Sequence, residues 1–159
     1  MKIDIIAVGK VKEKYLKMGM EEYLKRLQSH AKVTIVEVPD EKTIEGGSDR
    51  EVEIIREREG RGILKKIPEG AQVIVLDIQG KMLTSEELAS TFEEYGVRGK
   101  SHWVFVIGGS VGLSSSVLSR GDLRLSFSKM TFPHQLMRLI LLEQIYRGFK
   151  IIKKEPYHK

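Results

Sequence analysis

The sequence predicts an α/β protein with a mainly parallel sheet that has helices on both faces. Strand-like and helix-like segments alternate along the chain, which is the pattern of βαβ units. Two segments, residues 71–76 and 102–107, are apolar almost throughout, as expected for strands covered on both faces. We find no internal repeat and no linker rich in Pro or Gly, so residues 1–159 are expected to form a single domain.

Three further strands complete the predicted sheet. Residues 2–8 and 32–38 are short runs rich in β-branched side chains, and residues 123–127 form a weaker fifth candidate. Ser48-x-x-Glu51 and Thr84-x-x-Glu87 are capping-box patterns, and Pro133 occupies a favoured first-turn position. We therefore expect helices at residues 12–29, 48–66, 84–95, 114–120 and 133–149.

The last predicted helix is apolar around most of its circumference. A helix of this kind is buried on more than one side. A chain of 159 residues has little other material to cover the second face, so we expect a homodimer. A central core helix in a monomer is the alternative. The apolar positions are Leu136, Met137, Leu139, Ile140, Leu141, Leu142, Ile145, Tyr146 and Phe149.

Several function classes are excluded by composition. The chain has no cysteine, which removes disulfides, thiolate nucleophiles and zinc–thiolate sites. Its four histidines are scattered without ligand spacing, so no metal site is expected. No apolar run approaches the ~18–20 residues of a membrane span, and Asp4 interrupts the first apolar segment. We therefore expect a cytoplasmic protein without a membrane partner.

The net charge of +5 is concentrated in the last quarter of the chain. Residues 120–159 hold nine Lys and Arg against three acidic residues, whereas the other 119 residues are nearly balanced. This asymmetry favours a partner that is a polyanion. A solvated basic tail is the alternative.

Three glycine-containing or polar loops follow predicted strands and are expected to converge on one pocket. They begin at Asp77, at Gly108 and at Phe127. The loop Gly108-Gly109-Ser110-Val111-Gly112 has neither the spacing of a dinucleotide fingerprint nor the Gly-Lys-Ser/Thr of a phosphate loop. Open α/β sheets bind ligands at the carboxyl ends of their strands, so we predict a pocket there without assigning its chemistry.

Few titratable groups are expected near this pocket. His134 lies in the first turn of the last helix, where a structural histidine is the alternative reading. Arg138 follows one turn later in an apolar helix and needs an anionic or carbonyl partner. The chain ends in Tyr157, His158 and Lys159, either a frayed terminus or groups that grip an unpaired base.

Several motifs, in this order, resemble a known family. They are Leu76-Asp77-x-x-Gly80-Lys81, Ile107-Gly108-Gly109-Ser110-x-Gly112, Leu125-Ser126-x-Ser128-x-x-Thr131-Phe132-Pro133-His134, Glu143-Gln144-x-Tyr146-Arg147 and Pro156-Tyr157-His158-Lys159. Nearly the full chain resembles the methyltransferases of the SPOUT (α/β-knot) superfamily that modify N3 of a pseudouridine in large-subunit (23S) ribosomal RNA. The chain departs from relatives that carry Pro in place of Ser110 and Arg in place of Lys159.

The resemblance implies a C-terminal trefoil knot and a bound S-adenosylmethionine, bent among the knot loops. Such a knot is an exception to the general rule that chains do not thread loops. Carried over by position, the residues that bind this cofactor are Leu76, Gly108, Phe127, Ser128, Lys129, Met130, Thr131 and Phe132.

The resemblance also implies a target within the assembled ribosome. The candidates for catalytic groups are His134, Arg138, Tyr157 and His158. We hypothesise that the tail of one subunit closes over the cofactor site of the other. A non-catalytic ribosome-binding factor and a SPOUT methyltransferase that acts on tRNA are the alternatives.

Overall fold

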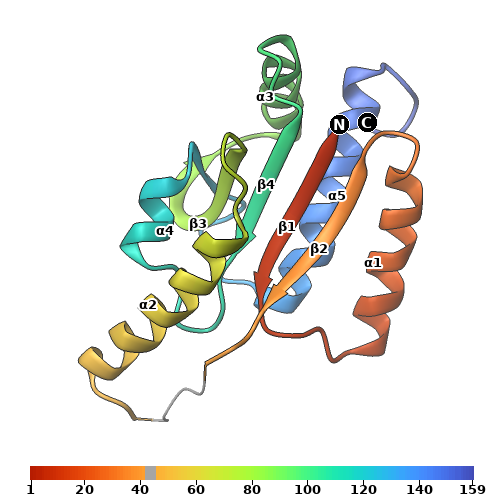
Figure 1. The fold of residues 1–159 in the computed structure, drawn as a ribbon. Helices are drawn as coiled ribbons and strands as arrows, with labels where there is room; N and C mark the ends of the chain where they lie inside the picture. Colours follow the sequence, from red (N-terminus) through yellow and green to blue (C-terminus); the bar gives the residue numbers. More distant parts are fainter. Residues whose placement is uncertain (42–45) are drawn as a thin grey trace.

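The structure is a computed structural model that describes residues 1–41 and 46–159. The described residues form one sheet in which every pairing is parallel, with strand order β2-β1-β4-β3-β5 (Figure 1). The α/β class and the five predicted strand positions are therefore confirmed. We call the end of the sheet at which the strands finish the carboxyl edge, and the opposite end the amino edge. The strands are β1 (Lys2–Val8), β2 (Lys32–Val38), β3 (Gln72–Met82), β4 (His102–Ile107) and β5 (Leu123–Ser126).

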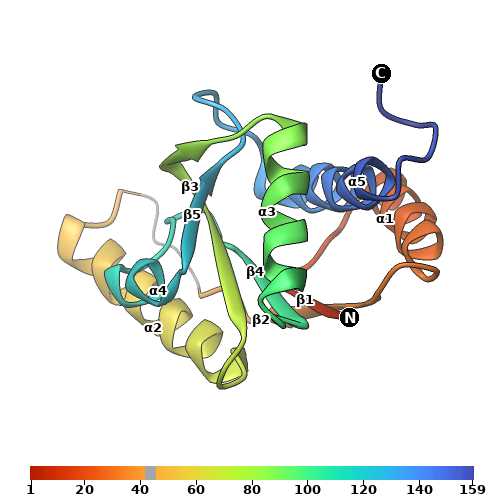
Figure 2. The ribbon, with the colours of Figure 1, turned by 90° about the horizontal axis from the view of Figure 1, so that it is seen from above.

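Helices cover both faces of this sheet (Figure 2). On one face, aromatic side chains such as Phe92, Trp103 and Phe105 form a buried cluster with α1, α3 and α5. On the other face, strand valines pack against Ile63 of α2 and Val117 of α4. The prediction of helices on both faces is thus confirmed. The helices are α1 (Lys14–Leu27), α2 (Asp49–Lys66), α3 (Ser85–Val97), α4 (Ser115–Arg120) and α5 (His134–Ile152).

The two predicted capping boxes differ in the structure. At α3, the Thr84 hydroxyl accepts the Glu87 N–H, and the Glu87 carboxylate accepts the Thr84 N–H, which completes the box. At α2, the Ser48 hydroxyl accepts the Glu51 N–H at 3.2 Å, but the Glu51 carboxylate lies beside that same hydroxyl. Ser48 therefore caps its helix without the reciprocal contact.

Strand β3 extends six residues beyond the predicted end at Leu76. It pairs with β5 twice, because both Leu76 and Lys81 lie opposite Leu125 and the chain bulges between them. Gly80 is where the backbones come closest, since a Cβ there would lie 2.7 Å from the carbonyl of Arg124. Glycine is required for this approach. The double pairing is compatible with the trefoil knot, which stays a prediction.

Helix α5 runs from the carboxyl edge to the amino edge. It begins at His134 with Pro133 as its N-cap residue and ends three residues beyond the predicted position. Its 19 residues correspond to a length of about 28 Å. Both chain termini lie at the amino edge (Figure 1). None of the helices in the described ranges is long and apolar enough to cross a membrane.

Candidate functional site

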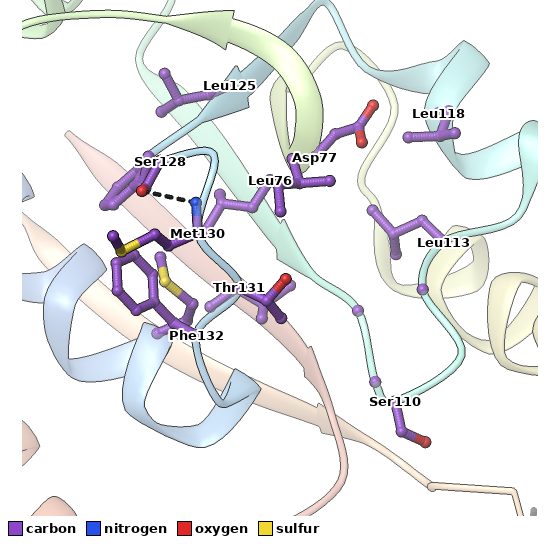
Figure 3. Close-up of a pocket in the computed structure, with 17 residues that line it drawn as sticks. Leu76, Asp77, Ser110, Leu113, Leu118, Leu125, Ser128, Met130, Thr131 and Phe132 are labelled. Carbon is purple, nitrogen blue, oxygen red and sulfur yellow. Dashed lines mark hydrogen bonds between the residues drawn. The ribbon is translucent and has the colours of Figure 1, made fainter.

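Three chain segments at the carboxyl edge enclose a cavity of about 330 Å³ (Figure 3). Two are the loops after β4 and β5, and the third, expected as a loop that begins at Asp77, is the part of β3 around its bulge. The predicted convergence on one pocket is thus confirmed. We call this the three-loop cavity. Its volume is within the range of small-molecule sites. Apolar side chains form most of its wall, among them Leu76, Leu113, Leu118, Leu125, Phe127, Phe132 and Met137.

The glycine loop after β4 brings main chain, rather than side chains, to the cavity. A Cβ on Gly108 would lie 3.0 Å from the Leu113 side chain, and one on Gly109 would lie 3.0 Å from Val8. Gly112 has a φ of +79°, a left-handed conformation that L side chains rarely adopt. Glycine at these positions therefore keeps the floor of the cavity open and its backbone groups accessible to a ligand.

The loop after β5 is shaped by its own hydrogen bonds. The Ser126 hydroxyl donates to the Ser128 carbonyl at 3.0 Å. The Ser128 hydroxyl accepts the Met130 N–H at 2.9 Å (Figure 3). The Met130 side chain is 74% exposed at the rim. The loop is therefore preformed, with an apolar side chain at its opening.

Seven of the eight residues predicted to bind the cofactor line the three-loop cavity. The exception is Lys129, which is exposed and does not line it. Sequence analysis missed Leu113 and Leu118, which flank the start of α4, and Met137 in the first turn of α5. The only available signal was their position just after loops that were already singled out. The seven residues are Leu76, Gly108, Phe127, Ser128, Met130, Thr131 and Phe132.

Comparison with known proteins assigns the family. A family described as "Predicted SPOUT methyltransferase" matches residues 1–158 of the chain. The chain is a SPOUT methyltransferase. Curated relatives named "Ribosomal RNA large subunit methyltransferase H" include those of Alkaliphilus oremlandii, 61% identical, and of Bacillus pumilus and Enterococcus faecalis, each 58% identical. Each alignment covers 100% of both chains.

A solved structure supports the fold of this SPOUT chain. It is a probable methylase family protein from Haemophilus influenzae, with a TM-score of 0.53 and 12% sequence identity. The alignment covers 99% of this chain and 70% of that one. At this identity the likeness concerns the fold alone.

The three-loop cavity fits S-adenosylmethionine, the cofactor of SPOUT methyltransferases. The cradle at Gly108 exists only because no Cβ fills it, and the apolar wall suits an adenine ring. Asp77 is the single acidic residue among those that line the cavity, and its carboxylate accepts the Gln79 N–H at 3.1 Å. One carboxylate in an apolar site suits a cationic ligand. The residues that would hold the cofactor are therefore those that line this cavity.

Arg138 is enclosed and fully engaged. Its side chain is 1% exposed. The guanidinium donates to Glu37 at 2.7 Å and to the carbonyls of Gly9 and Val8 at 2.9 and 3.3 Å. The prediction that Arg138 has an anionic or carbonyl partner is thus confirmed, because it contacts one carboxylate and two carbonyls. These contacts argue against the expected contact of Arg138 with substrate, and they give it the role of holding α5 to β1 and β2.

His134 does not face the three-loop cavity. It lines a second cavity at the carboxyl edge, between the end of β2, the β1–α1 loop and the first turn of α5. Met137, three residues later, faces the three-loop cavity. The first turn of α5 therefore separates the two cavities, and His134 is not beside the cofactor residues.

The tail, residues 155–159, is docked at the amino edge of its own chain. Tyr157 packs edge-on against Tyr146, with ring centroids 4.9 Å apart, and the Arg147 guanidinium lies over its ring. Burial raises the pKa of Tyr157 to about 12. In a single chain, the cavity thus borders the first turn of α5, whereas Tyr157 docks nine residues later, at Tyr146.

Both ring nitrogens of His158 are occupied. Arg147 donates to Nδ1 at 3.1 Å, so this nitrogen is an acceptor. Nε2 therefore carries the proton and donates to Glu86 of α3 at 2.5 Å. The same contact holds the pKa of Glu86 below its usual value. In this arrangement His158 has no nitrogen free for a substrate.

A buried carboxylate lies beneath the glycine loop. Glu59 of α2 is 3% exposed, and one of its oxygens accepts the Glu41 N–H at 3.1 Å. The other oxygen has no partner among the described residues and lies 3.4 Å from the Cβ position of Gly109. Burial, together with the neighbouring Asp40 carboxylate, raises the pKa of Glu59 to about 7.

Proposed function

We propose that the chain transfers a methyl group from S-adenosylmethionine to N3 of a pseudouridine in large-subunit (23S) ribosomal RNA, within the ribosome. The observation that carries this proposal is the three-loop cavity, whose walls are built from the motif residues that carry the family resemblance. The names of the curated relatives support ribosomal RNA as the substrate.

The chemistry asks two things of the protein. When bound, S-adenosylmethionine supplies an electrophilic methyl group. N3 of the base loses its proton as it attacks this group, so the chain must align the ring nitrogen with the cavity opening and stabilise the charge on the neighbouring carbonyls. Met130 places an apolar side chain at the rim of that opening.

The tail supports a site shared between two chains. Tyr157 packs on Tyr146, which follows Met137 of the cavity wall by nine residues, or about 14 Å along α5. While Tyr157 and His158 stay docked on Tyr146 and Glu86, no tail residue lines the cavity of its own chain. An antiparallel α5 of a second copy would bring its tail beside this cavity. We therefore infer a homodimer in which each tail serves the partner's site.

An apolar groove supports such a dimer. A hollow of about 270 Å³ lies between α3, β5 and α5. It adjoins the three-loop cavity, because Leu125, Phe127 and Phe132 line both. Ile140 contributes the second apolar face of α5 to this groove. A partner helix seated there would bury it.

The role of the tail follows from its chemistry. The Tyr157 ring offers a stacking surface for a base flipped out of its helix. His158 can donate a hydrogen bond from Nε2 to the developing charge only after the nucleotide bound at the partner's site replaces Glu86 as the acceptor. Tail docking therefore has to change when the substrate binds.

The test is transfer of labelled methyl from S-adenosylmethionine to pseudouridylated ribosomes that lack this modification. The full chain, a chain ending at Glu155, and H158A are compared, with K153Q as the matched control just before the tail. We expect label in large-subunit RNA with the full chain and K153Q, and its loss with the other two. Cofactor affinity and thermal unfolding are measured alongside, and both should be unchanged.

Other outcomes separate the alternatives. If the shortened chain still transfers label, the methyltransferase proposal stands but the tail is not part of the site. Label in tRNA and none in ribosomal RNA supports a tRNA methyltransferase. A chain that neither binds the cofactor nor transfers methyl supports a ribosome-binding factor. Sedimentation of the full chain as a monomer at assay concentration rules out the shared site.

A further inference from the structure

The second cavity at the carboxyl edge has a charge character unlike that of the three-loop cavity. It has a volume of about 530 Å³. Its lining includes the ammonium-bearing residues Lys10 and Lys12 of the β1–α1 loop, and His134 and Gln135 of α5. No Phe, Tyr or Trp of the described chain lines it. We call this the lysine cavity.

The two lysines are free to bind an external anion. Both are exposed, and neither forms an ion pair with any residue that the structure describes. Much of the basic excess noted in the last quarter of the chain is different, because Arg120, Arg147 and Lys150 have acidic partners within 4 Å. Lys10 and Lys12 therefore add unpaired positive charge outside the last quarter of the chain, where the basic excess lies.

Two acidic residues line the lysine cavity, and one of them is already paired. Glu37 pairs with the buried Arg138 at 2.7 Å, so this charge is neutralised inside the protein. Asp40 is exposed and forms no ion pair among the described residues, so it is the one unpaired carboxylate of the lining. The cavity thus presents two lysines against one unpaired carboxylate.

The loop that carries the lysines is fixed in place. The Gln135 side chain accepts the Lys12 N–H at 3.0 Å, which holds the β1–α1 loop to the first turn of α5. That same turn separates the lysine cavity from the three-loop cavity. At the sheet, Ala7 of β1 lies opposite Ile107 of β4, the residue before the glycine loop. The lysine cavity is therefore a rigid neighbour of the cofactor site.

We propose that the lysine cavity binds a backbone phosphate of the RNA strand next to the nucleotide being methylated, with Lys10 and Lys12 as the cationic groups. This inference rests on the proposed function for the identity of the strand. Ammonium groups bind phosphates as point charges, and backbone contacts fix the register of a nucleic acid without reading its sequence. The lack of Phe, Tyr and Trp in the lining fits contact with the backbone rather than with stacked bases.

The test compares two double variants that remove the same charge. K10Q/K12Q removes the lysines of the cavity. K2Q/K32Q, at the exposed starts of β1 and β2 on the amino edge, is the matched control. Methyl transfer to ribosomes gives KM and kcat, and filter binding of large-subunit RNA without cofactor gives affinity over a range of salt. Calorimetric titration with S-adenosylmethionine and thermal unfolding report on the cofactor site and the fold.

We expect K10Q/K12Q to raise KM at least tenfold with kcat within about twofold. Its plot of log affinity against log salt should be shallower by about 1, as expected for the loss of one phosphate contact. Cofactor affinity should match that of the control. Equal KM and salt slopes in the two double variants would overturn the proposal, as would a loss of cofactor affinity confined to K10Q/K12Q.

The binding measurement separates this inference from the proposed function. If the unmodified chain transfers no methyl group but its salt slope still depends on Lys10 and Lys12, the proposed enzyme activity is wrong and the phosphate site stands. If methyl transfer is the same with and without both lysines, the proposed activity stands and the phosphate site is wrong.

Discussion

The two edges of the sheet are built in opposite ways. At the amino edge, the tail is held by a network of polar and aromatic contacts in which Glu86, Arg147 and Tyr146 all take part. At the carboxyl edge, the three-loop cavity is bounded by glycine backbone and apolar side chains, and its opening carries the exposed Met130. One edge is filled by its own chain and the other is left open for a ligand.

This contrast shows how one helix can serve two purposes. The first turn of α5 separates two cavities, and its last turns form the docking surface of the tail. A change at one edge should therefore leave the other intact, unless it breaks the contact between α5 and the sheet.

The largest expected effect comes from filling the floor of the three-loop cavity. In G108V, a branched side chain must displace Leu113 or occupy the cavity, since even a Cβ lies 3.0 Å from that leucine. We expect the Kd for S-adenosylmethionine to rise more than tenfold, measured by calorimetric titration. G96V, at an open position of α3, is the control and should bind normally. Normal binding by G108V would mean that the cofactor does not approach this backbone.

Breaking the contact between α5 and the sheet should affect both edges. R138M leaves Glu37 and two carbonyls without their donor, and we expect the free energy of unfolding to fall by about 2–3 kcal/mol. Chemical denaturation measures this loss. R98M, which breaks an exposed pair with Glu94, should cost less than about 0.5 kcal/mol. A similar cost for both variants would contradict the role given to Arg138.

The buried carboxyl of Glu59 should make stability depend on pH. Its pKa of about 7 in the folded protein exceeds the ordinary value of 4.5, so the folded state holds the proton more tightly. This contribution to stability is complete below pH 4.5 and is lost as the pH rises through 7.

E59Q keeps the acceptor for the Glu41 N–H and removes the charge. We expect the variant to gain on the order of 1 kcal/mol at pH 8 and to show a flatter stability profile between pH 5 and 8. Thermal unfolding over this pH range measures both. E57Q, exposed on the same helix, should keep the slope of the unmodified chain, and the idea fails if E59Q keeps it too.

The smallest effect is expected at the exposed contact between α3 and the tail. E86Q weakens acceptance from His158, so amide hydrogens of residues 156–159 should exchange faster while cofactor affinity stays the same. Because His158 lowers the pKa of Glu86, the contact to the charged carboxylate should persist above pH 4.5 and be lost as the pH falls below it. E93Q, on the same helix away from the tail, is the control. If amide hydrogen exchange in E86Q is unchanged, the contact between Glu86 and His158 does not hold the tail in place.

Most of the fold was predictable from the sequence because the patterns that mark strands and helix starts are local. Apolar runs located every strand, and hydroxyl residues at Ser48 and Thr84 located the starts of two helices. The extension of β3 past Leu76 had no such signal, because Gln79, Gly80 and Lys81 are polar or small. The strand continues past its bulge because Lys81 and Met82 pair with β5, more than 40 positions later in the chain.

The candidate site was predictable to the extent that it is made of loops after strands. Six of the seven cofactor residues follow β4 and β5, the seventh, Leu76, lies in β3 just before its bulge, and the topology brings them together. The partners of Arg138 and the free charge of Lys10 and Lys12 were not predictable, because both depend on which distant side chains meet. The sequence indicated that Arg138 needs a partner but not which one, and it did not single out Lys10 or Lys12. The fold pairs Arg138 with Glu37 and places the two lysines together in one cavity.

The enclosure of Arg138 also has a consequence for how the protein is made. Its contacts with Glu37 and Val8 join residues 101 and 130 positions apart, among the most distant in the chain. During translation, β1 and β2 emerge long before this arginine is synthesised, so the wall between the two cavities closes only when the last helix arrives. The nascent chain therefore acquires its binding sites in one late step, after most of its sheet is already available to fold.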